Sequence, residues 1–215
     1  KTASGDGCIG AGGVSGPVGS SSGGTGSRDS VAYGAVGPSS VSCGCRTRVG
    51  LNRHEGRGRP VRVIKLGGSL LDMPELAESL SRWIQQQPPM LSLLVVGGGA
   101  SAEMIRRIDR THALGESAAH WLAIRAMQFN AKVIEALLPE TSRLESLQEL
   151  PSDSHDSGVK IVDPWEVLQQ ESSGEGALPE SWDVTSDSLA AWIATRANAS
   201  ELVLLKSTLP PVGAT

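Results

Sequence analysis

Apolar runs alternate with amphipathic segments along the chain from about residue 61. The run VRVIKL (residues 61–66) is rich in β-branched side chains and ends at two glycines, which is typical of a buried strand. The run LSLLVV (residues 91–96) is almost wholly apolar, as expected in a sheet covered on both faces, and it also ends in glycines. Shorter runs predict strands at residues 159–163 and 201–206.

Between these runs, apolar residues recur at spacings of three and four, which predicts helices. Asp72 and Glu75 have the spacing of a capping box and predict the start of the first helix, and Ser101 is the expected cap of the second. Further helices are predicted at residues 116–138, 164–170 and 181–197. The long helix carries one apolar stripe, formed by Leu122, Ala126, Phe129, Val133 and Leu137.

Strands that alternate with helices, and that are apolar on both faces, predict an α/β fold. We expect a three-layer α/β/α domain with a mainly parallel open sheet. The length and apolar character of the helix at residues 116–138 give it a central place in the domain and suggest a homo-oligomer.

Residues 1–60 have a different composition. They contain 16 of the 26 glycines and no apolar periodicity that could bury a core. We therefore predict a disordered Gly/Ser-rich tail at residues 1–60 and a folded domain at residues 61–215.

Charge is divided unevenly between these two parts. Residues 1–60 have seven Lys or Arg and three Asp or Glu. Residues 61–215 have twelve Lys or Arg and twenty Asp or Glu. An acidic domain argues against nucleic acid as a partner, because phosphate backbones are held mainly by Lys and Arg. The basic residues between Arg46 and Arg59 could contact nucleic acid or an anionic membrane, but a solvated leader is the simpler interpretation.

All three cysteines, Cys8, Cys43 and Cys45, lie within residues 1–60. The predicted domain therefore has no disulfide and no thiolate metal site, which suits a reducing cytosol. No segment approaches the roughly 20 apolar residues of a membrane span. We expect a cytoplasmic protein with no membrane partner and no protein-bound metal site.

Both long strands end in glycine clusters, at the sheet edge where α/β proteins bind ligands. The first cluster, KLGGS, combines a positive charge at Lys65 with the N–H groups of Gly67 and Gly68 and the Ser69 hydroxyl. The second is Gly97, Gly98 and Gly99. Each cluster alone could be a tight turn. Two in series favour a site for several phosphate groups.

Four further side chains are candidates for the same site, each with a structural alternative. Asp183 and Asp187 stand at the predicted mouth of a helix, where capping alone would explain them. Lys206 ends the last predicted strand and would open on the same sheet edge, or be solvated. His120 lies beside apolar residues on the long helix, where a structural role is common.

Three stretches in this order resemble the amino acid kinase superfamily: KLGGS at residues 65–69, VVGGG at residues 95–99 and DVTSDSLAA at residues 183–191. The resemblance runs from about Val61 to Ser207. Within the superfamily, SAAHWLAIRAM and SWDVTSDSLAAWIA are similar to segments of the branch that phosphorylates a phosphate group in methanofuran synthesis.

This resemblance implies a phosphotransferase that uses ATP with Mg²⁺ to phosphorylate a small phosphate or carboxylate acceptor. It implies that Lys65 neutralises charge on the transferring phosphoryl group. It also implies that Asp187 orients both Lys65 and Lys206. The implied nucleotide-binding residues are Gly67, Gly68 and Ser69. The implied acceptor-binding residues are Gly97, Gly98, Gly99, His120 and Asp183.

The relatives continue well past the strand that ends at Lys206, and their later region supplies much of the nucleotide pocket. We therefore expect a domain truncated at its C-terminus. The alternative to a kinase is a non-catalytic phosphate-binding or nucleotide-binding regulatory protein that retains the two glycine loops.

Overall fold

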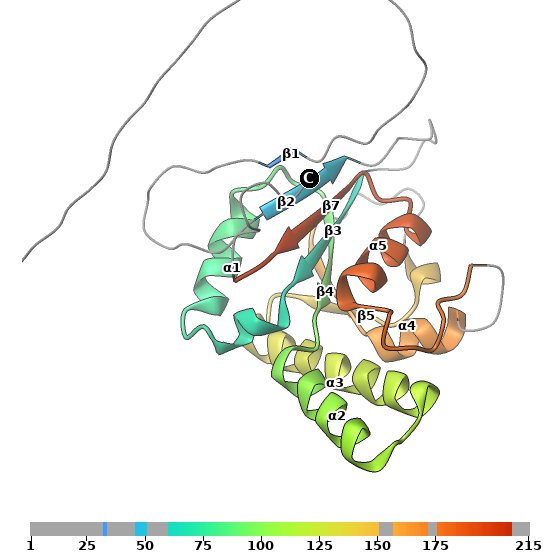
Figure 1. Cartoon of the computed structure of the whole chain (residues 1–215). Helices are drawn as coiled ribbons and strands as arrows, with labels where there is room; N and C mark the ends of the chain where they lie inside the picture. Colours follow the sequence, from blue (N-terminus) through green and yellow to red (C-terminus); the bar gives the residue numbers. More distant parts are fainter. Residues whose placement is uncertain (1–31, 34–45, 51–59, 151–156, 172–175, 208–215) are drawn as a thin grey trace, which may run out of the picture.

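A mixed sheet with a parallel centre organises the protein (Figure 1). The computed structural model describes residues 32–33, 46–50, 60–150, 157–171 and 176–207. In this part of the chain, parallel strands follow the order β7-β3-β4-β6-β5. Their bounds are Glu201–Leu205 (β7), Val61–Leu66 (β3), Leu91–Val96 (β4), Val159–Val162 (β6) and Ser142–Leu144 (β5). The predicted α/β fold with a mainly parallel sheet is confirmed.

Two antiparallel strands extend the sheet beyond β7. β2 (Arg46–Gly50) pairs with β7, and β1 (Ala32–Tyr33) pairs with β2. Both lie within residues 1–60, the segment for which composition predicts a disordered tail. Strands this short have no periodicity of their own and form by pairing with an existing edge. The rest of residues 1–59 lies outside the described residues.

Helices cover both faces of the sheet, as the predicted three layers require. The α-helices are Leu76–Gln85 (α1), Gly99–His112 (α2), Glu116–Leu137 (α3), Pro164–Glu171 (α4) and Ser186–Arg196 (α5). Short 3₁₀ helices occupy Gly68–Asp72 (η1) and Leu147–Glu149 (η2). Figure 1 shows α1 on one side of the strands and α4 and α5 on the other. Within the described ranges, no helix has the length and apolar character needed to cross a membrane.

Successive residues of each strand feed two separate cores, because side chains alternate across a sheet. Val63 and Leu93 pack in the core under α4 and α5. Ile64 and Leu94 pack in the core under α1. This two-sided burial explains why both strands have nearly continuous apolar sequences.

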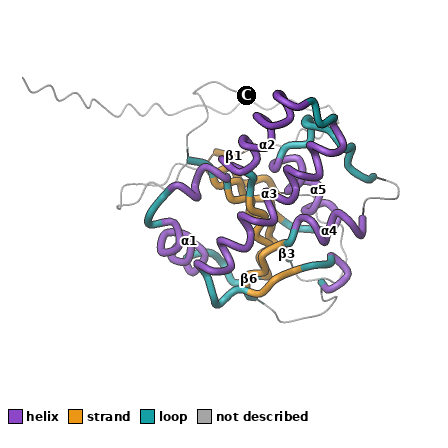
Figure 2. The backbone as a smooth tube through the Cα atoms, turned by 90° about the horizontal axis from the view of Figure 1, so that it is seen from below, coloured by secondary structure: helices purple, strands orange, loops and turns teal. Residues whose placement is uncertain are grey.

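The long helix α3 crosses the edge of the sheet and contributes to both cores. Ile124 and Met127 join the first core, and Ala131 and Ile134 join the second. Figure 2 shows α3 passing across the strands, between α1 and α4. Asn130 lies between these two apolar pairs, beside the glycines that end β4. The helix therefore passes under the predicted site.

Local capping signals were less reliable than the apolar pattern. Asp72 does not cap α1: it is the last residue of η1, and α1 begins at Leu76 without a side-chain cap. The chain tightens into η1 because Leu70 is buried against the sheet. Ser101 is not a cap either, since α2 begins at Gly99.

The apolar stripe predicted to hold α3 in a central position is mostly on the surface. Leu122, Phe129 and Leu137 are exposed, while a second stripe that includes Ile124, Met127 and Ile134 is buried. Periodicity detected a helix correctly but could not decide which of two apolar faces meets the core. α2, packed beside α3, has no buried residue.

A buried arginine ties three strands together at the other edge of the sheet. Arg62, in β3, is 2% exposed and forms an ion pair with Glu201 of β7. Its guanidinium also donates to the Ser92 hydroxyl of β4 (3.5 Å) and to the Pro88 carbonyl (3.3 Å). A charge this deeply buried is tolerated only with such partners.

We predict that Arg62→Ala lowers the free energy of unfolding by about 3 kcal/mol, because it removes one half of a buried ion pair. Urea denaturation followed by circular dichroism measures this. The matched control is Arg82→Ala, which removes an exposed pair with Glu78 on α1 and should cost about 0.5 kcal/mol or less. Equal losses in the two variants would show that the Arg62 pair contributes no more than a surface pair.

Candidate functional site

The carboxyl ends of β7, β3 and β4 lie in register and bring the predicted site residues to one edge. Lys65 pairs across the sheet with Leu204 on one side and Val95 on the other. The Gly67 N–H donates to the Leu205 carbonyl at 2.9 Å, and the Gly97 N–H donates to the Leu66 carbonyl at 2.8 Å. The two glycine loops therefore start side by side, one residue past the strands.

Lys65, Asp187 and Lys206 form a charged cluster at this edge. Asp187 lies in the first turn of α5, and its Oδ1 is 2.8 Å from the Lys65 ammonium. Its other oxygen, Oδ2, accepts a hydrogen bond from the Lys206 ammonium. Two cations share one carboxylate, so the cluster keeps an excess positive charge. The structure thus brings Lys65 together with Asp187 and Lys206, as the resemblance implied.

Burial sets the titration of this cluster. The Lys65 side chain is only 5% exposed. Its burial lowers its pKa below the ordinary 10.5, and Lys206 lowers it further, although Asp187 opposes both effects. Burial alone would raise the pKa of Asp187, but hydrogen bonds from Lys206 and Lys65 hold it below 3.8. Asp187 is therefore ionised at neutral pH.

The two glycine loops are in direct backbone contact. A Cβ atom on Gly68 would lie 2.1 Å from the Gly99 nitrogen, and one on Gly97 would lie 3.0 Å from the Gly68 nitrogen. Gly99 also has a positive φ of 49°, which favours glycine. Any side chain at Gly68 would force the loops apart. The glycines are thus required by this contact and not only by turns.

Backbone N–H groups at two helix starts face this contact. η1 begins at Gly68 and α2 begins at Gly99, and the first N–H groups of a helix have no partner within it. The N–H groups of Gly67 and Gly97 are already bound to neighbouring strands. The resemblance assigned Gly67 to phosphate binding, but its N–H is engaged in the sheet, so Gly68 and Ser69 are the better donors on this loop.

Asn130, a residue that the sequence analysis did not single out, holds the second glycine loop. Its side-chain amide donates to the carbonyls of Gly97 and Gly98, both at 2.8 Å, and its Oδ1 accepts from the Ser101 hydroxyl at 3.0 Å. Asn130 is buried. A polar residue between apolar neighbours in the middle of a long helix was the one signal available in the sequence.

Hydroxyl groups border the cluster. The hydroxyls of Ser69 and Ser207 are 2.8 Å apart and link the first glycine loop to the residue after Lys206. Ser186 lies against the second loop, since a Cβ on Gly97 would be 3.1 Å from its Oγ. These groups are small and polar, which leaves the loops accessible to an anionic ligand.

Asp183, in the segment before α5, takes no part in the ion pairs of the charged cluster. Thr185 is the N-cap of α5, and its Oγ1 accepts from the Ser188 N–H at 3.1 Å. The Asp183 carboxylate is exposed, and it forms no ion pair with any described residue. The adjacent Trp182 instead donates to Asp109 of α2 at 2.8 Å. The structure does not join Asp183 to the lysines.

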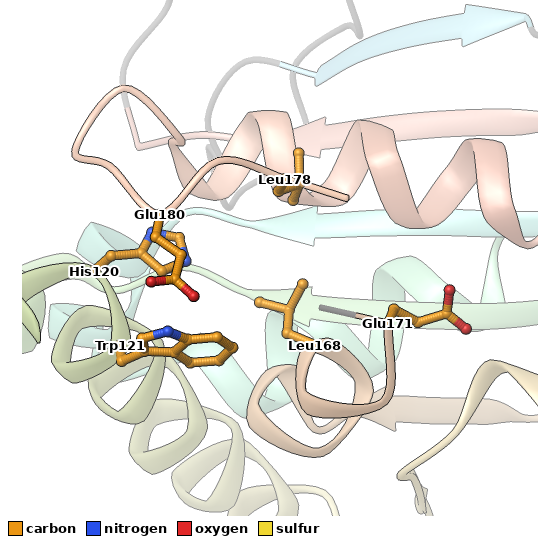
Figure 3. A pocket seen from close by; sticks show the side chains of 6 residues that line it. All are labelled: His120, Trp121, Leu168, Glu171, Leu178 and Glu180. Carbon is orange, nitrogen blue, oxygen red and sulfur yellow. The ribbon is translucent and has the colours of Figure 1, made fainter. Parts of the chain in front are cut away.

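His120 lines a small pocket that is separate from the lysine cluster (Figure 3). The pocket lies between α3, α4 and the segment before α5, and its lining residues are His120, Trp121, Leu168, Glu171, Leu178 and Glu180. His120 is buried, and its Nδ1 is 3.2 Å from the Ser181 carbonyl. It is thus a partnered histidine that braces the segment leading to Asp187.

The donor set fits an anionic ligand better than a protein-held metal ion. An excess positive charge, a glycine contact and helix N-termini together favour phosphate. In the described part of the chain, no group of three or more His, Cys, Asp or Glu side chains could hold a metal. Any Mg²⁺ at this edge would need ligands from a bound nucleotide.

The cluster predicts opposite effects of its two partners on Lys65. Asp187→Asn should lower the pKa of Lys65 further, because Asp187 is the group that raises it, whereas Lys206→Ala should raise it, because Lys206 lowers it. NMR titration of the Lys65 ¹³Cε signal measures both. Shifts in the same direction in the two variants would contradict this arrangement.

The same lowered pKa values predict how stability changes with pH. Between the lowered pKa of folded Lys65 and 10.5, the unfolded chain binds the additional proton, so stability rises with pH. Asp187 contributes stability above 3.8 that is lost as the pH falls through its lower folded pKa. Thermal unfolding of wild type and Asp187→Asn across pH isolates this contribution.

Comparisons with known proteins cover the same stretch. Residues 60–208 match the Amino acid kinase family. The [5-(aminomethyl)furan-3-yl]methyl phosphate kinase of Methanocaldococcus jannaschii is 26% identical over 145 residues, which are 67% of this chain and 64% of that protein. The chain therefore spans slightly less than two thirds of this relative.

Solved kinases are similar in structure over part of the chain. The uridylate kinase of Archaeoglobus fulgidus is 22% identical with a TM-score of 0.43, covering 64% of this chain and 59% of that one. The UMP kinase of Bacillus anthracis is 14% identical with a TM-score of 0.44, covering 66% and 62%. The family match extends over the glycine loops and the charged cluster, and the chain belongs to the Amino acid kinase family.

Proposed function

We propose that the protein is an ATP-dependent kinase that transfers the γ-phosphoryl group to a small phosphorylated acceptor. The observation that carries this proposal is the cluster of Lys65, Asp187 and Lys206 beside two contacting glycine loops. Phosphoryl transfer depends chiefly on positioning and charge neutralisation, so a site of cations and N–H donors without an obvious base suits it.

The proposed roles follow from position. Gly68 and Ser69, at the start of η1, hold nucleotide phosphates, and the loop at Gly98 and Gly99 holds the acceptor phosphate. An acceptor oxygen attacks the γ-phosphorus, the bond to the β-phosphate oxygen breaks, and ADP leaves. Lys65, fixed by Asp187, neutralises the charge that moves between the two substrates.

Mg²⁺ is proposed to arrive with the nucleotide. It would neutralise phosphate charge when bound, as it does in phosphoryl transfer generally. The chain's own contribution is the excess positive charge of the lysine cluster and the N–H groups of the two loops.

A phosphomonoester is the favoured acceptor. The similar protein from M. jannaschii is named for a phosphate acceptor that carries an aminomethyl group on a furan ring. A small phosphate at the second glycine loop would meet the N-terminus of α2, where free N–H groups favour an anion. We propose that this furan phosphate, or a compound like it, is the substrate, with a role in C1-carrier cofactor synthesis in the cytoplasm.

His120 is proposed to act through position rather than by contact with the acceptor. Its ring holds the Ser181 carbonyl, and Ser181 begins the segment that ends at Asp187. The pocket beside it contains Glu171 and Glu180, and hydrogen bonds from Ser117 and then Trp121 hold the pKa of Glu180 below its usual range. Glu171 is already paired with Arg196, so Glu180 is the carboxylate of this pocket that would suit a cationic group of a ligand.

ATP turnover against a panel of phosphomonoesters tests the proposal. The panel includes the aminomethylfuran phosphate, uridine monophosphate and a carboxylate acceptor. We predict that Lys65→Ala lowers kcat/KM by about 1,000-fold, because the transition state loses its buried cation. The matched control, Lys132→Ala, removes an exposed lysine of α3 and should retain activity.

Circular dichroism shows whether the Lys65→Ala variant is folded, and calorimetry shows whether the wild type binds ATP. Full turnover by a folded Lys65→Ala variant would remove the assigned role. A wild-type chain that binds ATP by calorimetry, yet phosphorylates no acceptor on the panel, would favour the non-catalytic nucleotide-binding protein instead.

A further inference from the structure

The two peptide groups between Gly97 and Gly99 have no side chain on either side to fix their orientation. A peptide group flanked by glycines can turn over with little steric resistance, because neither neighbour has a Cβ atom. One orientation presents N–H groups to a ligand, and the other presents carbonyl oxygens. The first attracts an anion and the second a cation, so the orientation determines what the second glycine loop can bind.

The Asn130 side chain holds the carbonyl groups of both peptide groups on the side of α3. Its Nδ2 donates to the Gly97 carbonyl and to the Gly98 carbonyl, each at 2.8 Å. Asn130 is 2% exposed, so water competes little for these bonds. In a planar trans peptide group, the N–H points in the direction opposite to the C=O. The N–H groups of Gly98 and Gly99 therefore point away from α3.

Ser101 determines which end of the Asn130 amide meets the loop. Its hydroxyl donates to the Asn130 Oδ1 at 3.0 Å. The two loop carbonyls can only accept, so the NH₂ group of the amide must face them, and its oxygen is left for Ser101. Ser101 lies in the first turn of α2, which begins at Gly99. Three hydrogen bonds thus tie the loop and the start of α2 to the middle of α3.

The N–H groups that point away from α3 lie on the side of the first glycine loop. A Cβ atom on Gly68 would be 2.1 Å from the Gly99 nitrogen, so this nitrogen lies against the first loop. The Gly99 N–H also opens α2 and has no partner within that helix. A phosphate group bound there would lie beside the loop that is proposed to hold the nucleotide.

The first glycine loop is fixed in a different way. The Gly67 carbonyl accepts from the Leu70 N–H at 2.9 Å within η1, and Leu70 is buried. This backbone turn fixes the direction of the Gly68 N–H without a side-chain clamp. A change at Asn130 should therefore alter the second loop and leave the first unchanged.

We propose that Asn130 is a positioning residue that sets the polarity of the second glycine loop, so that this loop binds the anionic group of the acceptor. Ser101 orients Asn130 for this role. The inference rests on the proposed function, which assigns the acceptor to this loop. Asn130 touches neither substrate and acts through the direction of the Gly98 and Gly99 N–H groups.

Titration of the full chain with inorganic phosphate, followed by amide NMR, tests this role without turnover. In the wild type we expect shifts at Gly98 and Gly99, and at Gly68 and Ser69 of the first loop. Asn130→Asp is nearly isosteric but replaces the two N–H donors by a carboxylate oxygen. It should weaken phosphate binding at Gly98 and Gly99 by on the order of 30-fold, with no change at the first loop.

Gln128→Glu is the matched control, because it makes the same chemical change two residues earlier on α3. Gln128 is also buried, but its amide donates to Asp163 and not to the glycine loop. This variant should be less stable, since two carboxylates then meet. It should nevertheless bind phosphate like the wild type. General destabilisation is thereby separated from a change in the loop.

Ser101→Ala gives a second measurement if Asn130→Asp does not fold. The change removes one partner of the Asn130 amide and leaves a small side chain at a half-buried position of α2. Phosphate affinity at Gly98 and Gly99 should fall by about threefold, and the amides of the first loop should respond as in the wild type. Unchanged affinity in this variant would contradict the role of Ser101.

Steady-state kinetics with a phosphomonoester that the wild type phosphorylates gives the corresponding split. Asn130→Asp should raise KM for the acceptor and leave KM for ATP unchanged. Equal increases in both KM values would show a structural effect and overturn the inference. So would phosphate binding that is the same in Asn130→Asp and wild type, or a wild type in which phosphate shifts no amide of the second loop.

Failure of the proposed function would look different. A wild-type chain that phosphorylates no acceptor, yet binds phosphate at Gly98 and Gly99 only when Asn130 is present, would contradict the kinase and support the role of Asn130. Turnover with an acceptor KM that does not respond to Asn130→Asp would support the kinase and exclude this role.

Discussion

The Asp187 carboxylate between two lysines is the interaction on which the site depends. Lys65 lies at the end of a buried strand, where an isolated ammonium would be costly. Asp187 opposes the lowering of the Lys65 pKa by burial and also pairs with Lys206, which follows the neighbouring strand. This one carboxylate thus couples the start of α5 to two strands. It also leaves the excess positive charge that an anionic substrate would meet.

Contact between the two glycine loops is the second constraint. Gly68 and Gly99 are too close for any Cβ, so both helix starts are held side by side. Asn130 adds a buried polar clamp from α3 to the second loop. The loops are consequently part of the packed structure, which favours preorganised N–H donors over a mobile phosphate loop.

The helix α3 has to satisfy three environments. One face joins both cores, Asn130 meets the glycine loop, and a third face is apolar yet exposed. A helix with apolar residues on more than one side has a low amphipathic contrast, so its orientation is weakly encoded in its sequence.

The sequence by itself determined the alternation of strands and helices, because apolar runs and helical spacing report local burial directly. It also identified Lys65 and the glycine loops as a combination that suits anions, and Asp187 as a candidate side chain at the start of a helix. Strands β1, β2 and β5 were not predicted, since they are short and gain stability only from a neighbouring edge.

Only the tertiary structure decided which residues meet. A helix and a strand lie between Asp187 and Lys206, and more than a hundred residues separate both from Lys65. The three side chains meet only because of the order of the strands in the sheet. The tertiary structure also revealed Arg62 and Asn130 as buried polar clamps. Hydrogen bonds and ion pairs between distant segments have no periodic signature in a sequence, and the fold alone brings their partners within reach.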